Sequence, residues 1–321
     1  MNRITLSRAI ACIGLAIGAL GLASCSKTES SPAAPSARPA SDAQSDAKRQ
    51  EIEKYNHYIK AINTDGKFDE TLERNENRVV PALKAGQPLS ALYVAEDYNI
   101  KSIKKELEAG LALSTPMPQL DAPAKTYAQA LARLEPLNHE LKSYADTKGY
   151  LSDNGAKARE QLPAYQAALQ ETVAARDAFD AATDKQDMAR IKENFDQQQA
   201  GSADYYKAGL IYHAKLSMAA SNDFFTDINN PAAQETFKAS LDKVNDMLTG
   251  LEGQLASEQS CYTVKSMTRA FLSNGRQILA DAKNGKYKNL DESRKRSLLT
   301  NINTFRRDST NLVTVVNMQR C

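Results

Sequence analysis

The chain has 321 residues, of which 25% are charged and 42% apolar, and this balance is typical of a folded globular protein. Trp is absent and Gly is scarce, so the composition favours helices over sheets. Lys and Arg number 41 against 39 Asp and Glu, and removing a leader that contains Arg3 and Arg8 leaves 39 of each. A neutral mature chain argues against a nucleic-acid-binding protein.

The first 24 residues have the composition of a secretory leader. Arg3 and Arg8 give it a positive start, and residues 9–22 form an apolar run. This run is shorter than the roughly 20 residues that a membrane-spanning helix needs. We therefore expect residues 1–24 to be a signal peptide.

The stretch Leu22-Ala23-Ser24-Cys25 resembles a bacterial lipobox. The resemblance implies cleavage before Cys25 and attachment of lipid, including palmitate, to this cysteine. Ser26 follows it rather than Asp, which resembles the pattern sorted to the outer membrane of Gram-negative cells. We expect a lipoprotein anchored there and facing the periplasm. The alternative is an ordinary leader, or an uncleaved anchor, in which Cys25 has no role.

Residues 25–45 would connect the lipid to the folded part. From Ser26 to Ser45 the chain is mainly Ser, Ala and Pro, with no large apolar residue. Such a segment buries too little surface to offset its chain entropy, so we predict a disordered tether.

Two of the four cysteines remain after the leader and the anchor are assigned. Cys12 leaves with the leader and Cys25 takes lipid, which leaves Cys261 and Cys321. An isolated pair in an oxidising compartment predicts a disulfide, and two free thiols are the alternative.

Helical periodicity dominates the rest of the chain. We predict a first helix from near Asp46 and a second over residues 68–83, which Pro81 bends or ends. Gly110 ends the third. The apolar stripes that mark the first and third helices are Ile52, Tyr55, Ile59 and Ile62, and Leu89, Leu92, Ile100, Ile103 and Leu107.

A Pro-rich connection at residues 111–122 is the best candidate for a boundary between two helical units. Asp121 and Pro123 predict the start of the helix that follows, and Gly149 its end. The inner face of this helix contains Tyr127, Leu131, Leu134, Asn138, Leu141 and Ala145.

The C-terminal half continues as helices. We predict them over about residues 154–182, from Met188, over 205–225, from Asn230-Pro231 to Leu248, from Val264 to Leu279 and from Asp291 to Val316. The last two form an αα-hairpin that a Cys261–Cys321 bond would close. The predicted fold class is all-α, an elongated bundle of about eight to ten helices over residues 46–318. One continuous bundle and two packed units are equally compatible with the pattern.

The common catalytic and cofactor-binding motifs do not occur. His57, His139 and His213 are the candidate histidine ligands or bases, and they lie on three predicted helices. We expect no metal site and no cofactor. The acid pairs are sequence neighbours, so they point to different sides of a helix. They are Asp69/Glu70, Glu96/Asp97 and Asp291/Glu292.

From Cys261 onward the chain carries twelve Lys or Arg and four acids. Arg294-Lys295-Arg296 and Arg306-Arg307 can bind lipid phosphates, but a solvated helix face is the simpler interpretation. No aromatic residue interleaves with them as a nucleic-acid site would need. The thirteen tyrosines either seal helix interfaces or line a groove for a peptide or glycan.

Three stretches resemble a known family. Residues 55–59 (YNHYI), followed by 68–72 (FDETL), resemble the opening of the YiiG-like lipoproteins, the DUF3829 family. Residues 144–150 (YADTKGY), with Asp153 and Ala156-Lys157 after them, resemble its central stretch, and 210–215 fit more loosely. The resemblance implies a helical bacterial lipoprotein and supplies no catalytic residues.

These observations favour a non-enzymatic, membrane-tethered binding or scaffold protein whose partner is an envelope protein or glycan. One alternative is a small-ligand or lipid-binding module with an apolar, Tyr-lined cavity. The other is a hydrolase of envelope polymers. Two facing carboxyl groups, one with a raised pKa, would indicate the hydrolase.

Overall fold

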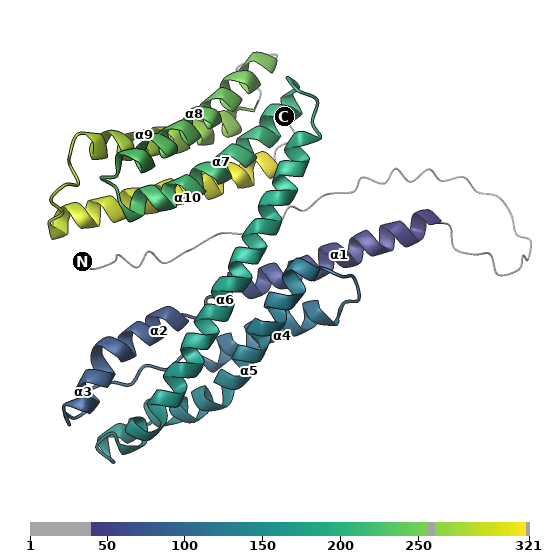
Figure 1. The fold of residues 1–321 in the computed structure, drawn as a ribbon. Helices are drawn as coiled ribbons and strands as arrows, with labels where there is room; N and C mark the ends of the chain where they lie inside the picture. Colours follow the sequence, from purple (N-terminus) through teal and green to yellow (C-terminus); the bar gives the residue numbers. More distant parts are fainter. Residues whose placement is uncertain (1–39, 256–260, 319–321) are drawn as a thin grey trace, which may run out of the picture. The chain divides into compact units, whose positions relative to one another are not determined.

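A computed structural model describes residues 40–255 and 261–318, and every regular element in these ranges is helical (Figure 1). The all-α fold class is confirmed, with ten α-helices in the described ranges. The elements are α1 (Ala40–Asn63), α2 (Phe68–Arg74), η1 (Asn75–Val79), α3 (Val80–Lys84), α4 (Asp97–Ala112), α5 (Pro118–Asp146), η2 (Gly149–Leu151), α6 (Ala156–Asp196), α7 (Ala203–Thr226), α8 (Pro231–Gln254), α9 (Tyr262–Lys283) and α10 (Glu292–Met318). Helix α1 begins six residues before Asp46, so the last residues of the predicted tether are helical.

The chain divides into two compact units between Gln186 and Asp187, inside α6. The division therefore does not fall near residues 111–122, where the proline content placed it. Those residues join α4 to α5 inside the N-terminal unit. They are held there because Lys54 of α1 donates hydrogen bonds to the carbonyl oxygens of Leu113, at 3.2 Å, and Thr115, at 2.8 Å.

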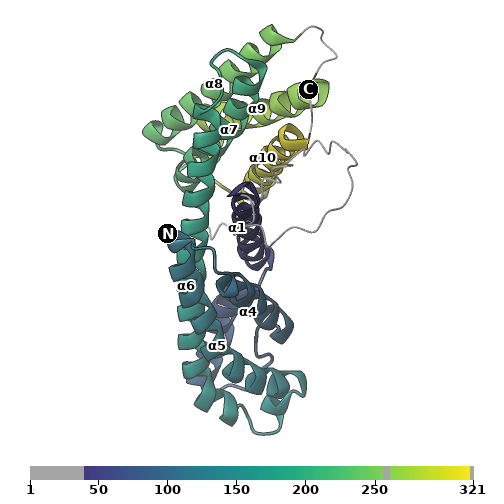
Figure 2. The same cartoon turned by 90° about the vertical axis from the view of Figure 1, so that its right-hand side faces the viewer.

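In the N-terminal unit, α4 packs against both α1 and α5 (Figures 1 and 2). The Phe179 ring of α6 meets the Tyr58 ring of α1 edge-on, with 5.6 Å between the centroids, and lies 6.1 Å from the Tyr127 ring of α5. All three rings are buried. The predicted stripes of α1 and α5 thus face a shared core.

Residues 68–84 are helical throughout, so Pro81 does not end the predicted helix, but residues 75–79 just before it form a π-helical turn. Proline has no N–H and cannot continue the backbone ladder. In η1 the Val80 N–H bonds to the Asn75 carbonyl oxygen, five residues back. The π-helical turn carries Asn75, which is fully buried.

Gly110 lies inside α4 and does not end it, contrary to the sequence prediction. A Cβ atom at this position would lie 2.5 Å from Cε1 of Tyr58. Glycine is therefore needed for the close approach of α1 and α4, and a stop signal was the wrong interpretation.

Replacing Gly110 by Ala should lower the free energy of unfolding by about 1 to 3 kcal/mol, since the Tyr58 ring must move to admit the methyl group. Gly253 of α8 is the matched control, because no atom lies within 4 Å of a Cβ built there. Gly253→Ala should stabilise the fold by up to about 1 kcal/mol through helix propensity. Urea denaturation measures both, and two equally stabilised variants would contradict the packing role of Gly110.

Helix α6 is continuous over 41 residues, so the predicted break before Met188 is wrong. The residues at that point, Thr183 to Asp187, include no Gly or Pro. Thr183 is fully buried and its hydroxyl donates to the Phe179 carbonyl oxygen at 3.0 Å, which leaves the helix intact.

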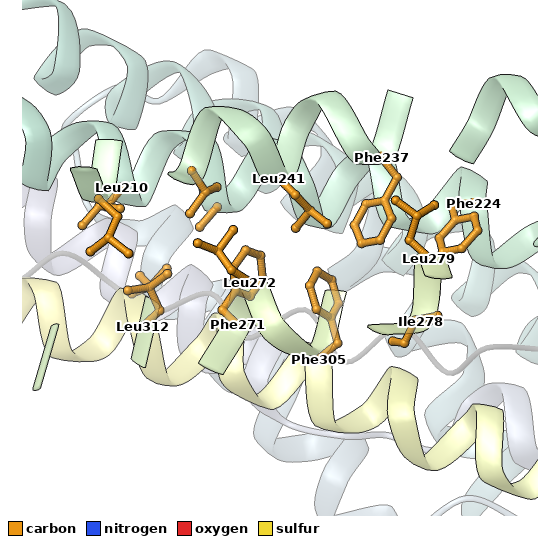
Figure 3. Close-up of a cluster of buried hydrophobic side chains, with 14 of the residues drawn as sticks. Leu210, Phe224, Phe237, Leu241, Phe271, Leu272, Ile278, Leu279, Phe305 and Leu312 are labelled. Carbon is orange, nitrogen blue, oxygen red and sulfur yellow. The ribbon is translucent and has the colours of Figure 1, made fainter. Parts of the chain in front are cut away.

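The C-terminal unit consists of the end of α6 and α7 to α10, and α9 and α10 form the predicted αα-hairpin. Asn230 caps α8 as predicted, with its side-chain oxygen accepting from the Ala232 and Ala233 N–H groups. Phe271 and Phe305 stack with 4.6 Å between ring centroids at the centre of the core (Figure 3).

Candidate functional site

The structure gives each histidine a separate set of contacts. His57 Nδ1 lies 2.7 Å from a Glu106 carboxylate oxygen, and His139 Nδ1 lies 2.8 Å from Asp97. His213 lies against the Phe195 ring, and burial lowers its pKa. Among the described residues, no group of three or more His, Cys, Asp or Glu side chains is placed to hold a metal ion.

The predicted acid pairs separate into different contacts. Asp69 pairs with Arg176 at 2.7 Å, whereas its neighbour Glu70 pairs with Arg74. Asp291 caps the start of α10 by accepting from the Arg294 N–H at 2.8 Å. A catalytic acid needs a raised pKa, whereas the pKa is lowered at six carboxyl groups of the described residues. They are Asp97, Asp121, Glu140, Asp153, Glu235 and Asp281.

The basic run of α10 is mostly solvated and partly neutralised. Arg294 lies 3.7 Å from Asp291, and Lys295 lies 3.9 Å from Glu292. Arg307 approaches the neighbouring Asp308 at 3.9 Å. These contacts fit the interpretation of a charged helix face.

Cys25, the predicted lipidation site, lies outside the described residues, and so does Cys321. Cys261 is buried and precedes α9 with a left-handed φ of 54°. The Cys261–Cys321 disulfide therefore stays a prediction.

Most tyrosines of the described residues are packed between helices. Tyr58, Tyr127, Tyr165 and Tyr287 are among the largest fully buried side chains. Tyr93 differs because it lines a pocket.

A buried polar network links α1 to the start of α5. Asp121 accepts from the Tyr58 hydroxyl at 2.6 Å, from the Lys54 ammonium at 2.9 Å and from the Met117 N–H at 2.9 Å. Burial opposes ionisation, but these hydrogen bonds lower the pKa of Asp121 below its ordinary value. Lys54 is only 3% exposed. The network is satisfied internally, so we assign it to stability.

The central stretch that resembles the DUF3829 family also has a structural role. The Tyr144 hydroxyl donates to Asp153 at 2.6 Å, and burial and this bond raise the pKa of Tyr144 to about 12. Asp153 also accepts from the N–H groups of Gly155 and Lys157, which caps α6. A Cβ on Gly149 would lie 2.5 Å from the Tyr144 ring. These residues shape the turn between α5 and α6.

The N-terminal unit contains a pocket of about 370 Å³, here called the α2–α5 pocket. It is lined by residues of the segment 66–74, the non-helical segment 92–96, Asn99 of α4, and residues of the last turns of α5, 142–146. Its volume lies within the usual range of ligand sites, at the small end.

Charges of both signs line the α2–α5 pocket. On the α2 side, the Arg74 guanidinium lies 5.3 Å from the Tyr93 ring centroid and pairs with Glu70. On the α5 side, Lys142 pairs with Asp146 at 2.7 Å, and this hydrogen bond raises the pKa of Lys142. The arrangement suits a polar ligand that carries both charges.

Buried side chains fix the pocket wall formed by residues 92–96. The Ala95 N–H donates to the Tyr165 hydroxyl at 3.0 Å, and the Ala95 carbonyl oxygen accepts from Asn138 at 2.9 Å. Asn138 also donates to Asp97 at 2.7 Å. An asparagine in the apolar stripe of α5 was the sequence signal for this network, and its meaning was missed.

A second pocket, of about 590 Å³, lies between α8 and α9. Leu248 and Leu272 are buried in it, and Arg269 and Arg276 flank it. Arg269 is already paired with Glu252 at 2.7 Å. The α8–α9 pocket lacks the buried polar support that holds the wall of the α2–α5 pocket.

In the ranges that the structure covers, none of the helices combines the length and apolar character of a membrane span.

The fold and the pocket define an all-helical protein with a small pocket lined by charged side chains. The chain belongs to the DUF3829 family, described as a protein of unknown function, whose family model matches residues 49–306. No curated protein and no solved structure matches the chain. The family expected from residues 55–72 and 144–157 is thus confirmed, and the YiiG-like label stays an expectation.

Proposed function

We propose that this chain is a lipid-anchored protein of the cell envelope that faces the periplasm and binds a polar envelope component in the α2–α5 pocket. The proposal rests on one observation. The pocket wall of residues 92–96 is fixed by buried side chains and lies between charged groups of both signs. The predicted leader and the predicted lipidation of Cys25 are the basis for placing the protein in the cell envelope. The proposed protein binds this component without changing it chemically.

The ion pairs in the pocket and the lowered pKa of a nearby carboxyl group favour binding over hydrolysis. Arg74 and Lys142 in the pocket are held in ion pairs. The pKa of nearby Asp97 is lowered, because hydrogen bonds from His139 and Asn138 outweigh the effect of its burial. A group of this kind accepts hydrogen bonds and does not deliver a proton near neutral pH. The charged lining also fits a polar component better than an apolar lipid.

Site-specific photo-cross-linking in cells tests the proposal. A photo-reactive residue in place of Glu96, a pocket residue whose side chain is 65% exposed, should capture one reproducible envelope component. Lys125 is the matched control, because it is exposed on α5 and lies about 25 Å along that helix from Lys142. Labelling there should yield no such adduct.

A charge variant completes this test. Replacing Arg74 by Gln and Asp146 by Asn together should abolish the adduct formed at position 96, because a ligand that carries both charges loses one contact of each sign. Adducts that are the same at positions 96 and 125, or that survive the double replacement, would refute binding in this pocket.

A further inference from the structure

Residues 92–96 have no regular secondary structure. Contacts on the buried side of this segment hold it in place. Leu92 and Ala95 are buried in the core. The Asn75 side chain donates to the Tyr93 carbonyl oxygen at 2.7 Å and accepts from the Tyr93 N–H at 3.3 Å. With Asn138 and Tyr165 on Ala95, three fully buried polar side chains hold the backbone N–H and C=O groups of two residues, Tyr93 and Ala95.

The backbone N–H and C=O of Val94, the residue between them, are left open. Among the hydrogen bonds of the described residues, none involves the N–H or C=O of Val94, which is half-buried and lines the α2–α5 pocket. A backbone N–H or C=O without a partner in the protein is available to a ligand. A main chain laid alongside can supply both a donor and an acceptor, as in the addition of a strand to an exposed backbone edge.

We propose that the ligand of the α2–α5 pocket is a peptide in extended conformation, whose main chain pairs with the N–H and C=O of Val94. This inference rests on the proposed binding function and names the class of ligand.

The charges on either side of Val94 fit the two ends of a short peptide. Arg74 lies on the α2 side and can receive a carboxylate, and Asp146 lies on the α5 side and can receive an ammonium group. A pocket of about 370 Å³ accommodates only a short stretch of chain. Because the wall is already fixed, the protein loses little entropy when the peptide binds.

The test uses the full mature chain and a library of tetrapeptides with free amino and carboxyl termini. Val94→Pro removes the Val94 N–H, whereas Val94→Ala keeps it and is the matched control. Val94→Pro should weaken binding of the selected peptides by about five- to a hundredfold, the expected loss when a hydrogen-bond partner is left unpaired. Val94→Ala should bind like the parent chain, and thermal melting establishes that both variants are folded.

The ligand side provides a second measurement that does not depend on folding of the proline variant. The same tetrapeptides with N-methylated amides cannot donate to the Val94 carbonyl and should bind more weakly by a similar factor. Equal binding of methylated and unmethylated peptides, or no binding of any tetrapeptide, would overturn the inference. A cross-linked partner at position 96 that is not a peptide would overturn it while leaving the proposed function intact.

Discussion

Replacing Asp121 by Ala should lower the free energy of unfolding by about 3 to 5 kcal/mol, the usual cost of leaving a buried charge without its partner. Lys54 would keep its two carbonyl acceptors but lose the Asp121 carboxylate. The Tyr58 hydroxyl and the Met117 N–H would lose their acceptor as well. Urea denaturation followed by circular dichroism measures the loss.

Two comparisons separate this effect from the loss of an ordinary ion pair. Glu171 pairs with Arg133 in the same unit, but both side chains are about half exposed, so Glu171→Ala should cost less than about 1 kcal/mol. The double variant Lys54→Met, Asp121→Asn removes both charges and should be more stable than Asp121→Ala. Equal stability of Asp121→Ala and Glu171→Ala would refute the role assigned to the network.

The same network predicts the acid response of the protein. Because the pKa of Asp121 is lower in the folded chain than in the unfolded chain, its ionised form stabilises the fold. This contribution is complete above the unfolded pKa, near 4, and is lost as the pH falls through the folded value. The stability difference between the parent chain and Asp121→Asn should therefore shrink below about pH 4.

The elements that could be predicted from the sequence are those whose signals lie within a few neighbouring residues. The cap at Asn230 and the C-terminal hairpin were predictable because periodicity and capping are read over a few residues. Gly110 was misread because its role is set by Tyr58, 52 residues earlier, and a glycine alone does not distinguish a stop from a close approach. The continuity of α6 through residues 183–187 was also not predicted.

The α2–α5 pocket could not be predicted for a related reason. Arg74 and Lys142 line it from different helices, and Val94 lies between them in sequence with no motif around it. Only packing brings these residues to one site. Asn138 and Lys54 did carry a usable signal, since each is a polar residue on an otherwise apolar helix face and is buried in a satisfied network.

The residues that resemble the family are mostly structural. Tyr58 serves the Asp121 network, Phe68 is fully buried, and Tyr144 with Asp153 shapes the start of α6. Such residues preserve the fold around the pocket without contacting a ligand. The pocket draws on both kinds of residue, because Glu70 and Asp146 lie within the resembling stretches, whereas Val94 and Lys142 lie between them.

Replacing Cys25 by Ala should abolish lipid attachment completely, because we propose that this cysteine is the sole acceptor. Burial of lipid is worth about 0.8 kcal/mol per methylene group, so one acyl chain holds a protein marginally and several hold it almost irreversibly. The variant should incorporate no alkyne-labelled palmitate and should move from the membrane fraction to the soluble periplasmic fraction. Labelling of cells followed by fractionation measures both.

Cys12→Ala is the matched control for this prediction, since it makes the same substitution within the predicted leader. It should keep both the label and the membrane location, because Cys12 would be removed on processing. Intact mass establishes whether residues 1–24 have been cleaved, so that retention by an unprocessed leader is distinguished from retention by lipid. A Cys25→Ala chain that still carries palmitate, or a cleaved one that stays with the membrane, would contradict the assignment of Cys25 as the anchor.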